Sequence, residues 1–139
     1  MLSGELAVHT KAHMELVDIT GKVEQAIAVQ GITDGLLTLF TPHTTAGITI
    51  NEGADPHVKE DLVGALKHMV PMAYPYRHME GNSPSHLMAM LTGSSVTVAM
   101  KNGRLLLGTW QRIFFCEYDG PRHRRLEWHC IATAENDAA

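Results

Sequence analysis

The sequence predicts a single-domain α+β protein with a mixed, mostly antiparallel sheet, two main helices and one short helix. The chain has 139 residues, which suffices for one domain with a hydrophobic core. Hydrophobic residues make up 45% of it and charged residues 19%, a composition typical of globular rather than disordered proteins. Strand-like segments outnumber helical ones and do not alternate with them, which argues against a Rossmann repeat. We expect one domain over residues 1–134 and a flexible tail at 135–139.

Two helices are predicted in the first half of the chain. Thr20 can cap a helix that stops just before Gly31, a residue that favours helix ends. Asp55 suits the N-cap and Pro56 the first position of a second helix, whose apolar stripe runs to Met69. Strand-like segments surround these helices at residues 4–9, 14–19, 35–41 and 47–51, the first two as a candidate hairpin.

A long polar loop at residues 72–85 follows the second helix, and loops of this length are usually functional or mobile. A short helix is expected at residues 85–91. The pair Asn102-Gly103 favours a tight type I′ hairpin. The remaining strands are predicted at residues 95–100, 104–107, 111–118 and 124–132. The apolar stripes of these elements predict a core that includes Leu62, Leu66, Met69, Val96, Val98, Phe114 and Leu126.

Composition also limits where the protein acts and what it binds. The net charge of -4 and the pI of about 6.1 disfavour non-specific binding to nucleic acid or to an anionic membrane. No apolar run approaches the ~18 residues that a membrane helix needs, and the N-terminus lacks the pattern of a signal peptide. We therefore expect a soluble, cytoplasmic protein in which Cys116 and Cys130 are reduced and unlinked.

The first candidate site follows a predicted strand, where His43, Thr44 and Thr45 occur together and Asn51 and Glu52 come just after the next strand. One interpretation is a substrate cradle with a general base, close to the free N–H groups of the second helix. The other is that the threonines favour strands and His43 is a surface residue. The residues alone favour the second interpretation.

The second candidate site lies in the long loop, where His78 and His86 flank Gly81 and Asn82. A loop of this length can bring two imidazoles onto one ion, and imidazole ligands suit Zn, Ni, Cu or Fe. Two loop histidines with unrelated roles are an equally good interpretation.

The third candidate site begins at Trp110, which can stack on a flat ring or be buried. Cys116 is more consistent with a buried strand residue than with a nucleophile, because no base or cation stands beside it. The arginines between Arg122 and Arg125 can hold a phosphate or form a solvated turn.

The runs HTTAGITINEGADPHVKEDL, YRHMEGNSPSHL and VTVAMKNGRLLLGTWQRIFFCEYDGPRHRR together resemble the YjbQ-like family, which is also labelled secondary thiamine-phosphate synthase. The resemblance covers nearly the whole chain. One departure is Pro84, which stands where the family usually has an acidic residue two positions before the second histidine. If that acid assists metal or substrate binding, this protein lacks it.

The resemblance implies a trimeric α+β protein with a site near a subunit interface. Its implied catalytic residues are His43, Glu52 and Asn82; Thr44, Thr45, Asn51, Trp110, Arg122 and Arg124 are substrate-binding candidates, and His78, His86 and His43 are metal candidates. A divalent ion of the Zn type is favoured, because Mg²⁺ prefers oxygen ligands. The implied function is an enzyme acting on a small phosphorylated metabolite, with thiamine-phosphate synthase activity as one form. The alternative is a non-catalytic trimer that binds a metal or an anion.

Overall fold

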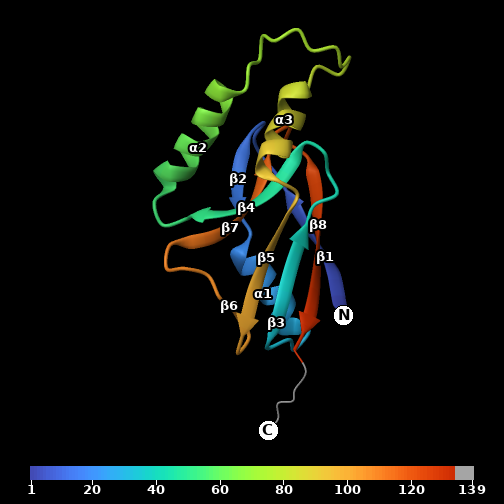
Figure 1. Ribbon diagram of the computed structural model, residues 1–139, viewed down its shortest axis with the longest axis vertical. Helices are drawn as coiled ribbons and strands as arrows, with labels where there is room; N and C mark the ends of the chain where they lie inside the picture. The colour runs from blue at the N-terminus through green and yellow to red at the C-terminus, as the bar shows by residue number, and fades with distance from the viewer. Residues whose placement is uncertain (134–139) are drawn as a thin grey trace.

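A computed structural model of the protein, which describes residues 1–133, contains two antiparallel sheets (Figure 1). One sheet has five strands in the order β1-β8-β3-β5-β6, and the other has three in the order β2-β7-β4. The strands of the larger sheet are β1 (Leu2–His9), β8 (His123–Ala132), β3 (Gly35–Phe40), β5 (Ser95–Lys101) and β6 (Arg104–Leu105). Those of the smaller sheet are β2 (Glu15–Asp18), β7 (Gln111–Glu117) and β4 (Ala46–Glu52). The predicted α+β class is confirmed, but within residues 1–133 both sheets are entirely antiparallel rather than mixed.

The three helices are α1 (Thr20–Val29), α2 (Pro56–Met69) and α3 (Ser83–Thr92). Asp55 caps α2 as predicted, since its carboxylate accepts a hydrogen bond from the backbone N–H of His57 at 2.9 Å. The predicted cap of α1 was wrong. Asp18 accepts from the N–H of Thr20 at 3.0 Å, while the Thr20 hydroxyl accepts from the N–H of Ile113 and so ties α1 to β7.

The core forms on both sides of the three-stranded sheet. On one side Ile113 and Phe115 pack against the five-stranded sheet and against Val23 and Ile27 of α1. On the other side Phe114 and Cys116 pack with residues of α2 and α3. Because β7 is covered on both faces, its apolar residues run without alternation.

Most of the predicted core is confirmed. Val98, Phe114 and Leu126 are buried, and Leu62, Leu66 and Val96 are partly buried against the two clusters. The prediction that Met69 belongs to the core was wrong, because this residue is 68% exposed. The reason is that α2 packs over β2, an edge strand, so only a narrow stripe of the helix finds a partner.

Long-range pairing overrides one predicted hairpin and preserves another. Strand β1 pairs with β8 and β2 with β7, so residues 4–9 and 14–19 do not pair with each other. The β5–β6 hairpin forms as predicted, with φ of 53° at Asn102 and 75° at Gly103, as a type I′ turn requires. The short helix starts earlier than predicted, at Ser83. The predicted tail at 135–139 lies outside the described residues.

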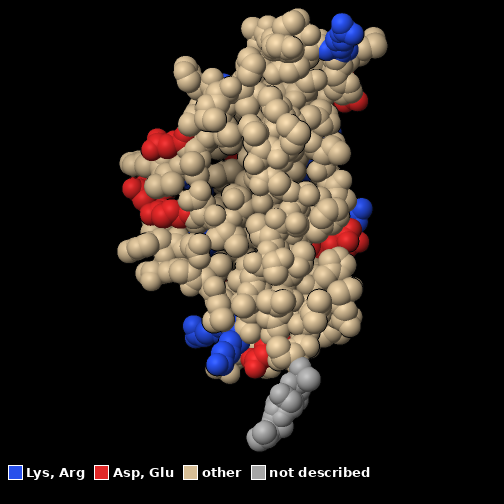
Figure 2. Space-filling view, viewed as in Figure 1, with Lys and Arg blue, Asp and Glu red and all other residues tan. Residues whose placement is uncertain are grey.

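The outer face of the five-stranded sheet leaves apolar side chains open to solvent in the single chain. Leu36 is 51% exposed, Phe40 36% and Ile131 62%. Figure 2 shows few charged side chains over the middle of this view, where β3 and β5 lie. Cys116 and Cys130 are free and buried, as predicted. Within residues 1–133, no helix has the length and apolar character needed to cross a membrane.

Candidate functional site

A pocket of about 470 Å³ opens where β4 begins, β7 ends, β8 starts and α3 begins. Residues that are far apart in the sequence meet here because the two sheets converge at this end. Eight of the predicted site residues line it: His43, Thr44, Thr45, His78, Asn82, His86, Arg122 and Arg124. Pro42, Glu80 and Asp119 complete the lining.

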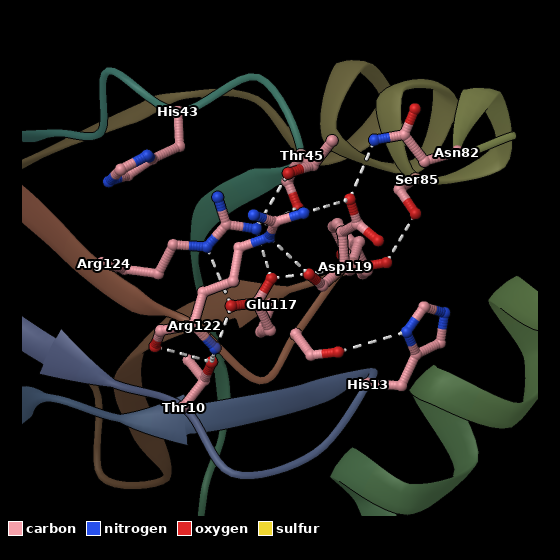
Figure 3. Close-up of polar contacts among 12 residues, drawn as sticks. Thr10, His13, His43, Thr45, Asn82, Ser85, Glu117, Asp119, Arg122 and Arg124 are labelled. Carbon is pink, nitrogen blue, oxygen red and sulfur yellow. Dashed lines mark hydrogen bonds and ion pairs between the residues drawn. The ribbon is translucent and has the colours of Figure 1, made fainter. Parts of the chain in front are cut away.

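A buried ion pair forms the floor of the pocket (Figure 3). Glu117, at the end of β7, and Arg124, near the start of β8, have side chains that are 0% and 5% exposed. Arg124 Nε donates to Glu117 Oε1 at 2.8 Å, and Arg124 Nη2 donates to Glu117 Oε2. The Thr10 hydroxyl donates to the same carboxylate at 2.7 Å, and Thr45 Oγ1 accepts from Arg124 Nη2 at 2.8 Å. Burial raises the pKa of Glu117, but the hydrogen bonds from Arg124 and Thr10 outweigh it, so the net shift is downward.

Asp119 organises the rim. Its carboxylate accepts from Asn82 Nδ2 at 2.8 Å and from Arg122 Nη2 at 3.1 Å. Burial opposes ionisation here too, yet these two donors leave the pKa of Asp119 below its usual value. The other amide atom of Asn82, Oδ1, is buried and makes no hydrogen bond within residues 1–133. Such an acceptor is available to a ligand or to a neighbouring imidazole N–H.

His43 is held as a neutral hydrogen-bond donor. Its Nε2 accepts a hydrogen bond from the backbone N–H of Arg125 at 3.0 Å, so the proton of the neutral ring resides on Nδ1. Burial lowers the pKa of His43, and the nearby charges of Arg124 and Arg125 lower it further. At neutral pH this side chain therefore presents an N–H group and no free lone pair, a role different from that of a metal ligand.

His78 and His86 both line the pocket and lie against each other, with ring centroids 5.6 Å apart and planes at 73°. Two imidazoles bound to one tetrahedral zinc ion have centroids about 5 Å apart, given a Zn–N bond of about 2.0 Å. The spacing of the two rings is close to that value. Within residues 1–133, no group of three His, Cys, Asp or Glu side chains is arranged to hold a metal, so other ligands would come from water or substrate.

Three predicted site residues lie elsewhere in the chain. Asn51 and Glu52 end β4, whereas Thr45 precedes its first residue, and a strand of this length separates its ends by about 20 Å. Glu52 instead accepts hydrogen bonds from the N–H groups of Ala54 and Asp55, ahead of α2. Trp110 is next to this end of β4, since its carbonyl accepts from the N–H of Gly53, and it is 62% exposed.

Comparison with known proteins identifies the family. The family model described as "UPF0047 protein YjbQ-like" matches residues 4–133, which is almost the whole chain. The chain belongs to the YjbQ/UPF0047 family. This confirms the resemblance inferred from the sequence.

Relatives in this family are similar over most of their length. UPF0047 protein MJ1081 of Methanocaldococcus jannaschii is 50% identical over 117 residues, covering 84% of this chain and 85% of the relative. UPF0047 protein YugU of Bacillus subtilis is 48% identical over 120 residues, covering 86% and 91%. The crystal structure of an uncharacterized YjbQ/UPF0047 family protein from Clostridium acetobutylicum has a TM-score of 0.88 and 45% identity, covering 92% and 99%. Hypothetical protein APE1520 from Aeropyrum pernix has a TM-score of 0.90 and 37% identity, covering 96% and 100%.

Sequence reasoning missed Glu117 and Asp119. A signal for Glu117 was present: it follows the apolar run IFFC and shares strand parity with Ile113 and Phe115, so its side chain must point inward. The same parity places Arg124 with Leu126 in β8. A buried acid and a buried arginine each need a partner of opposite charge, but their positions in the sequence do not show that the two meet.

Proposed function

We propose that this pocket binds a small phosphorylated metabolite together with a Zn-type ion on His78 and His86, and catalyses displacement of a phosphate or pyrophosphate group. The observation that carries the proposal is the meeting of a pair of imidazoles at shared-ion distance with Arg122 and Arg124 in one pocket. Arginine suits phosphate because its donors match the spacing of phosphate oxygens.

The charge balance of the pocket supports the metal. The lining carries two positive side chains, Arg122 and Arg124, and two negative ones, Glu80 and Asp119. Buried Glu117 also pairs with Arg124, so these side chains carry no net positive charge and a phosphate dianion needs a further one. A divalent ion on His78 and His86 supplies it.

Each residue then has a defined task in a displacement reaction. In the thiamine-phosphate synthase form, a thiazole nitrogen attacks the methylene carbon of a pyrimidine diphosphate, the carbon–oxygen bond breaks, and pyrophosphate leaves with the bonding electrons. The N–H of His43 and the guanidinium of Arg124 stabilise charge on the leaving oxygens. Asn82 orients an imidazole or the substrate through Oδ1. When bound, the ion neutralises part of the leaving group's charge.

Calorimetric titration tests whether the pocket binds phosphate. It also shows whether a bound Zn²⁺ ion or protonated histidines supply the positive charge. Wild type, His78→Ala and His86→Ala are titrated with Zn²⁺, and then with phosphate and pyrophosphate with and without Zn²⁺. His68→Ala, an exposed residue of α2, is the matched control. We expect Zn²⁺ and Zn²⁺-dependent phosphate binding to be lost in the two pocket variants alone.

The pH dependence gives an independent reading. Zn²⁺ and protons compete for the same imidazole nitrogens, so Zn²⁺ binding should weaken as the pH falls. Protonated histidines would instead strengthen phosphate binding at low pH without metal. Equal affinity of all variants for every ligand would refute the proposed site.

Turnover decides between an enzyme and a second candidate function, a non-catalytic protein that binds a metal or an anion. The observation that favours the second is that His43 cannot serve as a general base, because its Nε2 lone pair already accepts the backbone N–H of Arg125 at 3.0 Å. Incubation with the pyrimidine diphosphate and the thiazole phosphate, followed by chromatography, should yield thiamine phosphate and pyrophosphate in equal amounts. Binding without product would support the second function.

The proposal also includes a cytoplasmic homotrimer that binds neither nucleic acid nor membrane. Support comes from the bare face of the five-stranded sheet, where Leu36, Phe40 and Ile131 are exposed in a single chain. Light scattering should return about three times the chain mass of 15.3 kDa. A mass equal to one chain at micromolar concentration would refute the trimer.

A further inference from the structure

The arginine at the floor of the pocket is fixed through two of its three nitrogens. Glu117 takes hydrogen bonds from Arg124 Nε and Nη2, and Thr45 takes two more from Nη2, through Oγ1 at 2.8 Å and the carbonyl at 3.3 Å. Within residues 1–133 the third nitrogen, Nη1, makes no hydrogen bond. In Figure 3 it points toward the side of the pocket where His43 lies.

We propose that Glu117 is a positioning residue, which locks Arg124 so that Nη1 donates to a phosphate oxygen of the ligand. This inference rests on the proposed function, because it concerns how the same pocket holds its phosphate. A free arginine side chain loses much rotamer freedom when it binds an anion. Here Glu117 and Thr45 have already removed that freedom, so the ligand meets a preorganised donor.

Stability alone is a poor explanation for this pair. Both side chains are almost fully buried, at 0% and 5% exposure, and burying two charges removes most of the gain from pairing them. Well-packed apolar residues at such positions are often as stable or more so. The presence of an ion pair at the floor of a pocket is therefore better explained by the donor that Arg124 offers to a ligand.

Glu117 also reaches the rim. Its Oε2 accepts from the backbone N–H of Asp119 at 2.9 Å, and Asp119 in turn holds Asn82 and Arg122 by their side chains. One carboxylate outside the pocket lining thus sets the positions of both arginines and of the pocket amide. No other acidic side chain within residues 1–133 connects to both arginines in this way.

The test is titration of the full-length protein with inorganic phosphate and pyrophosphate in the presence of Zn²⁺. Glu117→Gln keeps the shape of the side chain and removes its charge, and Arg124→Lys keeps the charge and removes the guanidinium fork. Glu24→Gln, at an exposed position of α1, and Arg104→Lys, in β6, are the matched controls. Zn²⁺ affinity without phosphate is measured for every variant, as a readout of the His78–His86 pair.

We expect Glu117→Gln and Arg124→Lys to weaken phosphate binding about 10- to 100-fold, the range found when a partner that orients a ligating group is removed. Zn²⁺ affinity should stay within about twofold, and both controls should bind like wild type. The combined variant should be no weaker than Arg124→Lys alone, because both changes remove one arrangement. If Glu117→Gln does not fold, Arg124→Lys, which retains both charges, decides the matter.

The possible results distinguish the positioning role of Glu117 from the proposed function of the pocket. If folded Glu117→Gln binds phosphate as tightly as wild type does, the positioning role of Glu117 is overturned and the proposed function stands. Arg124→Lys with wild-type phosphate affinity would do the same. Equal losses of phosphate and Zn²⁺ affinity would show a general structural role for Glu117 and would also overturn it. Wild type that binds neither phosphate nor pyrophosphate would overturn the proposed function and this inference together.

Discussion

Removing one member of the buried ion pair should destabilise the protein more than removing both. After Arg124→Met, Glu117 stays buried and charged but keeps only two of its donors, the Thr10 hydroxyl at 2.7 Å and the Asp119 N–H at 2.9 Å. Breaking a buried pair in this way typically costs about 3–5 kcal/mol of unfolding free energy. The two remaining donors place Arg124→Met at the lower end, about 3 kcal/mol.

The reverse change should be worse. Glu117→Leu leaves a buried guanidinium whose remaining acceptors are the hydroxyl and carbonyl oxygens of Thr45, and we expect about 5 kcal/mol. The double variant buries no charge. Its cost reduces to the N–H of Asp119 left without its acceptor and Thr45 Oγ1 left without its donor, about 2 kcal/mol in total. The Thr10 hydroxyl keeps the carbonyl of Arg122 at 3.2 Å as an acceptor.

Urea unfolding at a fixed protein concentration measures these values, with fluorescence of the buried Trp128 as the probe. The difference between the double variant and the sum of the singles gives the coupling of the pair. Single variants that cost less than about 1 kcal/mol, or a double variant that costs as much as their sum, would refute the reasoning.

Three further predictions follow from burial and ionisation. The pKa of Glu117 in the folded protein lies below its usual 4.5, so the stability that its ionised carboxylate contributes is fully present above pH 4.5 and is lost as the pH falls through the folded pKa. Wild type should therefore lose more stability on acidification than the Glu117→Leu/Arg124→Met double variant. An equal loss of stability in both proteins between about pH 6 and pH 3, measured by urea unfolding, would contradict this. Leu126 is fully buried, so Leu126→Ala should lower the free energy of unfolding by about 2–5 kcal/mol. Leu66 lies in the half-buried stripe of α2, so Leu66→Ala should lower it by about 1 kcal/mol. Equal urea midpoints for the two variants would contradict the assigned burial. Cys116, whose pKa is about 12, should resist alkylation in the folded protein and react after unfolding, which mass spectrometry can follow; rapid modification of the native protein would contradict its burial.

Local signals in the sequence were reliable where a short segment determines its own conformation. Asp55 and Pro56 start α2, and Asn102 and Gly103 form the β5–β6 turn, because capping and positive φ angles depend on a few adjacent residues. Strand pairing was not predictable in this way. β1 pairs with β8 from the other end of the chain, and its alternation is equally compatible with a local hairpin.

The candidate site shows the same difference between local signals, which were reliable, and long-range contacts, which were not predictable. His78 and His86 were expected together because one loop connects them, and the structure places them side by side. Glu52 was grouped with His43 because it is near in sequence, but the extended strand between them carries it to the opposite end of the three-stranded sheet. The Glu117–Arg124 pair required knowing that β7 and β8 belong to different sheets that converge.

The double coverage of β7 has a consequence for how the pocket opens. Its amides lie in the middle of a sheet that is packed on both faces, so they should exchange with solvent only through global unfolding. His78 lies in residues 70–82, which form neither helix nor strand and make few backbone hydrogen bonds. Hydrogen exchange should therefore divide the pocket into two walls, with the amides around Glu117 protected for as long as the domain stays folded and those around His78 exchanging through frequent local opening.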